Sequence, residues 1–269
     1  MIKRENALFL FSKKGSLIVM IHVLISGALG SMGHQLAQAI EADPDFTVVA
    51  GVDIRSDDTL PYPVYQGFGG VKEDPDVLID FSRADALDAV LEFATEKKIP
   101  TVICTTGHTP AQKAAIANAA LSVPIFYSFN TSLGIALTRA LVRQAAQTLG
   151  SGFDMEIVET HHHRKLDAPS GTAVMLFDAL NEAHGGDLVP VYDRQSRRQA
   201  RQAQEVGISS VRGGTMVGEH SVFFFGPDEV IEIRHQAFSR QVFATGALRS
   251  AKYLVGKLPG LYDMDDVIG

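Results

Sequence analysis

The sequence predicts an α/β protein, in which a doubly wound parallel sheet is followed by an α+β domain with an open mixed sheet. In the first half, short apolar runs alternate with segments of helical periodicity, as in parallel sheets with helices on both faces. After residue 133 the pattern changes to a long helix and then to strands with alternating apolar and polar residues. The length of 269 residues is sufficient for two domains.

The first domain is predicted from its apolar runs and their periodicity. The expected strands cover residues 21–26, 46–52, 76–80, 101–104 and 124–127. The expected helices cover residues 34–40, 84–97 and 110–121, and the last opens on Pro110, which is favoured in a first helical turn.

A glycine-rich turn joins the first strand to the first helix. Gly27 permits a tight turn, Gly30 lets the backbone approach a pyrophosphate, and Gly33 lets the helix pack closely on the strand. The spacing is G-x-x-G-x-x-G, a weaker signal than G-x-G-x-x-G, and such turns also occur in units that bind no nucleotide. Asp53 ends the second strand twenty residues after Gly33, where a carboxylate meets a ribose hydroxyl. Together these features predict a dinucleotide site.

Ligands of parallel sheets bind beyond the carboxyl ends of the strands. We expect the residues at those ends to surround one cofactor: Gly27, Ala28, Leu29, Gly30, Ser31, Met32, Asp53, Phe81, Ser82, Thr105, Thr106, Gly107, Ser128, Phe129, Asn130 and Thr131.

The second domain is predicted to combine two helices with four strands. The helices cover residues 133–149 and 173–183, and the strands cover 154–159, about 206–212, 219–226 and 229–236. In the last strand Ile231 and Ile233 alternate with Glu232 and Arg234, so one sheet face is covered and the other is more polar. This open face is a candidate subunit interface.

The segment 159–172 concentrates groups that move protons and hold anions. His161, His162 and His163 are imidazoles that titrate near neutrality, and Lys165 adds a positive charge. Ser170-Gly171-Thr172 precedes an apolar run and predicts a helix N-terminus, where backbone N–H groups and the helix dipole favour an anion. The alternative is a solvated histidine-rich loop ahead of an ordinary capped helix.

Composition excludes several classes of function. A net charge of −7 disfavours nucleic-acid binding, and the most basic stretch, 194–201, is expected to be a solvated loop or helix face. The one cysteine, Cys104, excludes an intrachain disulfide and fits a reducing compartment. We find no apolar run of membrane-spanning length, and we expect residues 1–19 to be a dispensable extension ahead of Met20.

The most specific motif is Glu159-x-His161-His162-x-x-Lys165-x-Asp167-Ala-Pro-Ser-Gly-Thr-Ala173. With the Gly27–Gly33 loop, Thr105-Thr106-Gly107, Asn130 and the segment from Ser239 to Ala247, the chain closely resembles the 4-hydroxy-tetrahydrodipicolinate reductase (dihydrodipicolinate reductase) family. The resemblance covers residues 20–266. It implies a Rossmann-type dinucleotide domain from 20–129 with 239–269, a substrate and oligomerisation domain from 130–238, and a cytoplasmic homotetramer.

The resemblance also implies the reaction and the residues that carry it out. NADH or NADPH reduces a cyclic dicarboxylic imine, with loss of water, and no metal takes part. His161 is the implied proton donor and acceptor, and Lys165 the implied proton donor. The implied substrate-binding residues are His162, Thr106, Ser170, Gly171 and Thr172. The implied cofactor-binding residues are Gly27, Ala28, Leu29, Gly30, Ser31, Met32, Asp53, Cys104, Thr105, Thr106, Ser128, Phe129, Asn130 and Thr131.

Chemical reasoning from the residues agrees with these roles. Two substrate carboxylates need two anion holders, which the Ser170 helix start and the pair of His162 and Lys165 supply. A cation beside the electron density left by hydride addition stabilises it and donates the proton, although Lys165 also suits a plain electrostatic anchor. We expect His163 and Arg164 to be exposed and Asp167 to orient the turn.

Cys104 and the pair of Asp53 and Arg55 bear on how the cofactor is bound. Cys104 stands where the family often has glycine, and it either crowds the nicotinamide or is inert packing at a strand end. Asp53 favours a free ribose hydroxyl and hence NADH, whereas Arg55 is placed to accept a 2′-phosphate. We predict use of both cofactors, with NADH at least as good.

Three other functions fit parts of the sequence. The first is another two-domain Rossmann oxidoreductase, such as a sugar or semialdehyde enzyme. A semialdehyde enzyme that works through a thioester needs a cysteine nucleophile, and Cys104 is poorly placed for that role. Metal-assisted hydrolysis by the three histidines lacks the H-E-x-x-H spacing. A catalytically silent NAD-binding sensor keeps the glycine loop but needs neither His161 nor Lys165.

Overall fold

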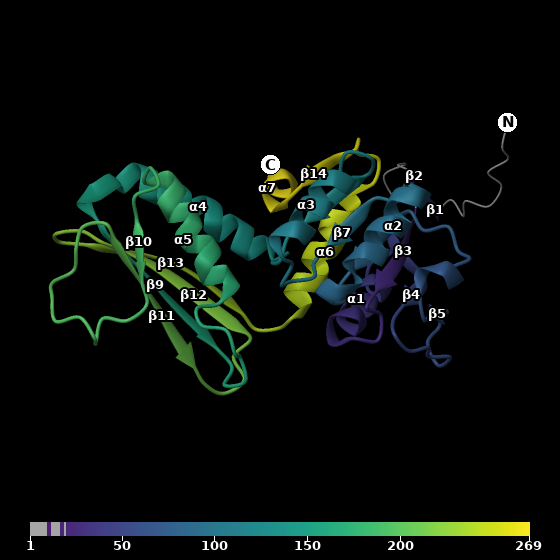
Figure 1. Ribbon diagram of the computed structural model, residues 1–269, viewed down its shortest axis with the longest axis horizontal. Helices are drawn as coiled ribbons and strands as arrows, with labels where there is room; N and C mark the ends of the chain where they lie inside the picture. Colours follow the sequence, from purple (N-terminus) through teal and green to yellow (C-terminus); the bar gives the residue numbers. More distant parts are fainter. Residues whose placement is uncertain (1–9, 12–16, 19) are drawn as a thin grey trace. The chain divides into compact units, whose positions relative to one another are not determined.

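The structure is a computed structural model that describes residues 10–11, 17–18 and 20–269. It divides into two units, shown with their elements in Figure 1. The first unit holds the described residues up to Thr131 together with Phe243–Val267, and the second holds Ser132–Val242. Of the expected extension, Leu10–Phe11 (β1) pairs antiparallel with Leu17–Ile18 (β2). The other residues of 1–19 lie outside the described part, as does the expectation that the extension is dispensable.

The first unit is built on a seven-stranded sheet in which every neighbouring pair is parallel. Its order is β14-β8-β7-β6-β3-β4-β5. The strands are β3 (Ile21–Ser26), β4 (Phe46–Val52), β5 (Val64–Tyr65), β6 (Val77–Asp80), β7 (Thr101–Ile103), β8 (Pro124–Tyr127) and β14 (Gly260–Tyr262). The central strands are continuous apolar runs because both faces of a parallel sheet are covered.

Helices cover this sheet, as the alternating pattern predicts. They are α1 (Ser31–Glu41), α2 (Leu87–Lys97), α3 (Pro110–Ala119), α6 (Gln241–Leu254) and the short α7 (Met264–Ile268). Residues from α2 and α3 form one buried cluster with Ile103 of β7 and Ile125 of β8. The helix α3 begins with a capping box in which Thr109 and Gln112 satisfy each other's backbone N–H groups.

The second unit is a five-stranded mixed sheet of order β10-β11-β9-β12-β13. The strands are β9 (Asp154–His161), β10 (Val189–Val191), β11 (Glu205–Arg212), β12 (Gly218–Phe225) and β13 (Val230–Ala237). The helices α4 (Leu133–Leu149) and α5 (Gly171–Ala183) pack against one face, around Ile157, Val222 and Phe224 (Figure 1). The strands β9 to β11 are parallel, whereas β12 is antiparallel to both β9 and β13.

The other face of this sheet is partly apolar. Phe223 and Phe225 stack with ring centroids 5.7 Å apart, and Val230 and Val211 are about half exposed. The predicted alternation is confirmed within β13, where Ile231 and Ile233 pack against the core and Glu232 and Arg234 are exposed, but the other face as a whole is less polar than predicted.

The arginine-rich stretch 194–201 is an exposed loop, as expected, and three of its arginines also form ion pairs. Arg194 and Arg197 bind Glu205, and Arg201 binds Asp154 and Glu156. The three guanidiniums neutralise carboxylates that the sheet presents, and this pairing of distant residues has no local sequence signal.

Several element boundaries match the prediction and others differ for physical reasons. The bounds of β3, β4, β8 and α4 are as predicted. The helix α1 begins three residues earlier than expected, since Gly30 is its N-cap and the glycine turn leads directly into it. The strand β9 continues to His161 because Thr160 pairs with both neighbouring strands and His161 pairs with Arg212 of β11. The prediction missed β5, β10, β14 and α7, which are too short for periodicity to detect.

A substitution at Gly246 of α6 tests how closely this helix packs against the segment at Thr131. A Cβ atom at this position would lie 1.7 Å from the backbone oxygen of Thr131, so an alanine must force the two segments apart. We expect Gly246→Ala to lower the free energy of unfolding by about 1–3 kcal/mol. Urea unfolding checks this, with Gly69→Ala as the control because nothing lies within 4 Å of the Cβ atom it would add. Equal stability of the two variants would contradict the prediction.

Candidate active site

The glycine turn after β3 has the geometry of a phosphate-binding loop. Gly27 has a φ of +78°, and a Cβ atom there would lie 2.7 Å from the backbone oxygen of Phe81. A Cβ atom at Gly33 would lie 2.3 Å from the backbone oxygen of Gly27. Both positions therefore require glycine, and Gly30 caps the N-terminus of α1, where the helix dipole favours an anion.

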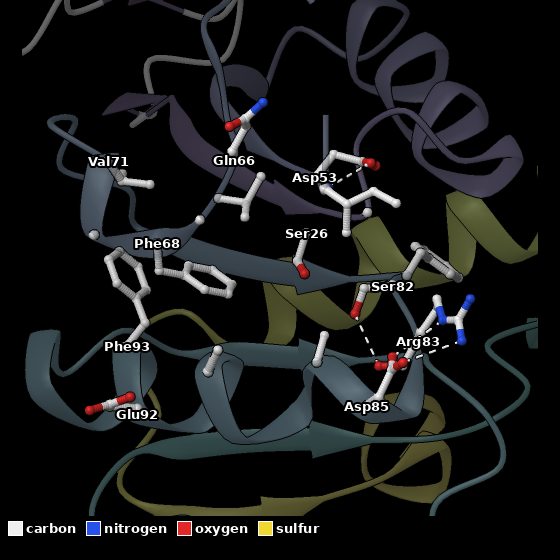
Figure 2. A pocket seen from close by; sticks show the side chains of 18 of the residues that line it. Ser26, Asp53, Gln66, Phe68, Val71, Ser82, Arg83, Asp85, Glu92 and Phe93 are labelled. Atoms are coloured by element: carbon white, nitrogen blue, oxygen red, sulfur yellow. Dashed lines mark hydrogen bonds and ion pairs between the residues drawn. The ribbon is translucent and has the colours of Figure 1, made fainter. Parts of the chain in front are cut away.

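Asp53 lies beside this turn and holds it. Its carboxylate accepts the backbone N–H of Leu29 at 3.0 Å and that of Ile54 at 2.8 Å. Asp53 also lines a cavity of about 800 Å³ that Gly27 and Gly30 share, a volume in the range of cofactor pockets. Figure 2 shows Asp53 at one part of this cavity and the stacked rings of Phe68 and Phe93 at another. The residues present thus fit a dinucleotide.

The charges that line the cavity are mainly negative. The carboxylates are Asp53, Asp85, Glu92 and Glu96, and the cations are Arg83 and Lys97. Arg83 is already paired with Asp85, whose oxygen lies 3.2 Å from the Arg83 Nη2 atom. Arg55, which the sequence offered as a 2′-phosphate partner, is exposed and does not line the cavity.

The buried carboxylate of Asp80, which the sequence did not single out, organises the next two strand ends. Its oxygens accept the hydroxyl of Ser82 at 2.5 Å and the hydroxyl of Thr105 at 2.7 Å. Thr105 is buried, whereas Thr106 is exposed and Gly107 has a φ of +82°. Asp80 therefore fixes the backbone that presents Thr106.

Cys104 has the environment of an inert thiol. It is buried, and this burial, followed by the nearby charge of Asp80, raises the pKa of the thiol well above its ordinary value. A thiol that stays protonated is a poor nucleophile, so the structure favours packing as the role of Cys104.

The loop after β8 is held by hydrogen bonds within the loop and to α6. The Ser128 hydroxyl donates to the backbone oxygen of Asn130 at 2.8 Å, and the Thr131 hydroxyl donates to that of Phe243 at 2.7 Å. The side chain of Phe129, in the same loop, is about half exposed. Of the expected cofactor residues, Gly27, Gly30, Asp53, Phe81 and Ser82 line the cavity, and the structure does not place the others in its wall.

In the second unit, β9 brings Glu159 and His161 to the same buried face. The Nδ1 atom of His161 lies 2.5 Å from a carboxylate oxygen of Glu159. Arg212 of β11 donates two hydrogen bonds to the same carboxylate, at 2.7 and 2.8 Å. Burial acts to raise the pKa of Glu159, but the hydrogen bonds from His161, Arg212 and Ser210 outweigh it and hold the pKa well below its ordinary value.

The Ser170 helix start is confirmed and is tied to a further histidine. The Ser170 hydroxyl accepts the backbone N–H of Ala173 at 3.2 Å as the N-cap of α5. The same hydroxyl lies 2.9 Å from the Nε2 atom of His220, whose ring meets that of His161 edge-on at 5.2 Å. Burial, reinforced by the charge of His161, lowers the pKa of His220 to about 3, so this ring is neutral at physiological pH.

The remaining signature residues form a cationic patch. Lys165 Nζ lies 2.9 Å from a carboxylate oxygen of Asp167. Burial and then the charges of Arg164 and Arg240 lower the pKa of His162. The Nδ1 atom of His162 is buried and has no hydrogen-bond partner within the described residues. His163 and Arg164 are exposed, as expected.

Comparisons with known proteins agree with this geometry. Residues 21–131 match the family model "Dihydrodipicolinate reductase, N-terminus", and residues 134–268 match "Dihydrodipicolinate reductase, C-terminus". The chain belongs to the dihydrodipicolinate reductase family. It is 47% identical to the 4-hydroxy-tetrahydrodipicolinate reductase of Caldanaerobacter subterraneus subsp. tengcongensis, over 93% of this chain and 99% of that one. It is 43% identical to the reductase of that name from Exiguobacterium sp., over 92% and 95% of the two chains.

Solved structures share the fold of this chain. A dipicolinate-bound dihydrodipicolinate reductase from Paenisporosarcina sp. TG-14 superposes with a TM-score of 0.77 at 24% identity, covering 93% of this chain and all of that one. A myo-inositol dehydrogenase from Corynebacterium glutamicum gives a TM-score of 0.56 at 14% identity, over 93% of each chain. The alternative of another two-domain oxidoreductase therefore shares the fold, whereas the sequence matches are to dihydrodipicolinate reductases.

In the second unit, two residues of the candidate site were not predicted as site residues. Arg212 ends β11 and His220 lies near the start of β12, and each meets its partner only through long-range pairing. Within the described residues, no helix is long and apolar enough to cross a membrane. No group of three or more potential ligand residues there is arranged to hold a metal ion.

His220 gives the stability of this reductase a defined pH dependence. Its pKa is depressed from 6.5 to about 3 in the folded state, so between these values only the unfolded chain takes up the proton. The contribution of His220 to the free energy of unfolding is therefore complete above about pH 6.5, and it is lost as the pH falls towards 3. We expect His220→Gln to reduce the slope of unfolding free energy against pH in this window by up to about 1.4 kcal/mol per pH unit.

Urea unfolding at a series of pH values measures this slope. The exposed His163, changed to Gln, is the matched control in the same unit. If His220→Gln and His163→Gln alter the slope equally, His220 does not carry the effect.

Proposed function

We propose that this chain catalyses the NAD(P)H-dependent reduction of 4-hydroxy-tetrahydrodipicolinate to tetrahydrodipicolinate, in lysine and diaminopimelate biosynthesis. The observation that carries the proposal is the intact signature from Glu159 to Ala173, folded into a buried carboxylate–histidine pair beside a cationic patch and a capped helix start. The first unit binds the dinucleotide, the second binds the substrate, and a bound nicotinamide supplies the hydride.

The second unit provides two kinds of anion holder for a substrate with two carboxylates. The N-terminus of α5 carries backbone donors and the positive end of the helix dipole, and Ser170 fixes its position. His162 and Lys165 provide a side-chain donor and a positive charge. Asp167 holds the Lys165 ammonium until a substrate carboxylate or the developing charge competes for it.

Proton transfer is the task of His161 and Lys165. Reduction of a conjugated imine by hydride leaves electron density that must be protonated, and Lys165 supplies both a positive charge and a proton. His161 exchanges protons through the ring nitrogen that does not face Glu159. Thr106, which is exposed at a strand end of the first unit, is also proposed as a substrate contact.

A coupled assay tests the reaction and Lys165 together. Aspartate semialdehyde and pyruvate are fed through the preceding synthase, and oxidation of NADH is followed. We expect turnover that depends on this protein, and a fall in kcat on the order of 10²–10⁴-fold for Lys165→Met, because the variant lacks the proton donor. Lys113→Met, at an exposed position of α3, is the control and keeps full activity. Binding of NADH without any oxidation would favour the sensor function instead.

We propose that NADH is the preferred cofactor, on the charge of the cavity. A 2′-phosphate brought beside Asp53 meets a lining with four carboxylates and two cations, one of which is already paired. The ribose hydroxyls of NADH suit the Asp53 carboxylate as hydrogen-bond donors.

Replacement of Asp53 tests the cofactor preference. We expect Asp53→Asn to raise the kcat/KM ratio of NADPH to NADH on the order of tenfold, because it removes a charge worth about 1.4 kcal/mol against the phosphate. Steady-state kinetics with both cofactors measure the ratio, and Asp58→Asn, exposed and outside the cavity wall, is the control. A wild-type preference for NADPH would contradict the proposal.

We also propose that the reductase acts in the cytoplasm as a homotetramer. Support for assembly comes from the partly apolar face of the second sheet, where Phe225, Val230 and Val211 are exposed.

A further inference from the structure

One buried carboxylate joins three separate elements of the second unit. Glu159 of β9 is fully buried, and its oxygens accept hydrogen bonds from Arg212 of β11, from the backbone N–H of Ser170 at the start of α5, and from His161. The guanidinium neutralises the carboxylate, and five N–H and O–H donors, including the Ser210 hydroxyl, surround it. A carboxylate solvated in this way stays ionised and accepts only.

This arrangement decides which nitrogen of His161 carries the proton. An ionised carboxylate has no proton to donate, so the Nδ1 atom at 2.5 Å must be the donor. The neutral ring then has a bare Nε2 atom, which is the nitrogen left to accept or return a proton. A Cβ atom at Gly218 would lie 3.0 Å from Nε2, so the glycine keeps the space beside this nitrogen free of a side chain.

Arg212 also binds the turn that carries Lys165. Its Nη2 atom, besides binding Glu159, donates to the backbone oxygen of Asp167 at 2.7 Å. The side chain of Asp167 in turn binds the Lys165 ammonium at 2.9 Å. One guanidinium therefore fixes the carboxylate behind His161 and the residue that holds Lys165.

We propose that Glu159 and Arg212 are the positioning residues of this site: Glu159 fixes the His161 proton on Nδ1 so that Nε2 faces the reaction, and Arg212 holds both Glu159 and the Asp167 turn. The inference rests on the proposed function for its catalytic consequence. The tautomer of His161 is a property of the protein alone and is measured without turnover.

The first experiment reads the tautomer directly. A long-range ¹H–¹⁵N correlation spectrum of the ¹⁵N-labelled full chain distinguishes protonated from bare ring nitrogens, and His161→Asn identifies the His161 signals. We expect a protonated Nδ1 and a bare Nε2 for the neutral ring. In Glu159→Gln one of the two acceptor oxygens becomes an NH2 donor, and Arg212 competes for the carbonyl oxygen that remains, so we expect the Nδ1–H form no longer to be fixed. A wild-type ring with its proton on Nε2 would overturn the proposal.

The second experiment separates positioning from binding in the coupled assay. We expect Glu159→Gln to lower kcat on the order of 10²–10⁴-fold while the KM for NADH stays within about twofold, because the cofactor is bound by the other unit. Glu156→Gln is the matched control, since Glu156 lies on the opposite face of the same strand and binds Arg194 and Arg201. A kcat loss of equal size in both variants would overturn the proposal.

A double variant keeps the test valid if Glu159→Gln leaves Arg212 buried without its partner and fails to fold. Glu159→Leu with Arg212→Met removes both charges and the acceptor of the His161 proton together. We expect this variant to fold but to remain slow and to lack the fixed Nδ1–H form, and wild-type kcat in it would overturn the proposal. A wild-type protein with the Nδ1–H form but no turnover would instead refute the proposed reaction alone.

Discussion

The ion pair between Glu159 and Arg212 is the interaction on which the second unit depends. It links β9 to β11 across parallel strands, receives the N-terminus of α5 through Ser170, and reaches the Asp167 turn. Breaking a buried pair by removing one partner typically costs about 3–5 kcal/mol, because it leaves an uncompensated charge. Such a pair makes the positions of the surrounding groups strongly interdependent.

The first unit uses buried or half-buried carboxylates in a related way. Asp80 holds the hydroxyls of Ser82 and Thr105, and Asp53 holds the backbone of the glycine turn. Each carboxylate lies at the carboxyl end of a parallel strand, where the backbone must leave the sheet and its N–H groups lose their ladder partners. Acidic side chains supply the missing acceptors and so stiffen the loops that surround a ligand.

The charge pattern of the two units matches the chemistry proposed for them. Carboxylates dominate the cavity of the first unit, which suits a cofactor recognised through its hydroxyls. Cations and a helix N-terminus dominate the signature region of the second unit, which suits a dicarboxylate. His220 adds a neutral ring beside His161, since burial keeps its pKa near 3, and it anchors Ser170 without adding a competing positive charge.

Much of the fold was predictable because its signals are local. Apolar runs gave the bounds of β3, β4 and β8, and helical periodicity gave α4. The two- and three-residue strands β5, β10 and β14 escaped prediction, since they exist only through pairing with a neighbouring strand. The extension of β9 to His161 has the same cause, and it moves this histidine from an expected loop to the buried end of a strand.

The sequence by itself determined the glycine turn and the Ser170 cap, because these depend on local sterics and capping. It offered three adjacent histidines and Lys165 as candidates, and only the family resemblance singled out His161 among the histidines. Only the tertiary structure decided which groups face them. Arg212 is 53 residues from Glu159 and His220 is 50 residues from Ser170. Strand pairing brings these partners together, and no local pattern encodes the identity of a partner at that distance. The exclusion of Arg55 from the cofactor cavity has the same physical reason, since the path of the chain after β4, and not the spacing from Asp53, places its side chain.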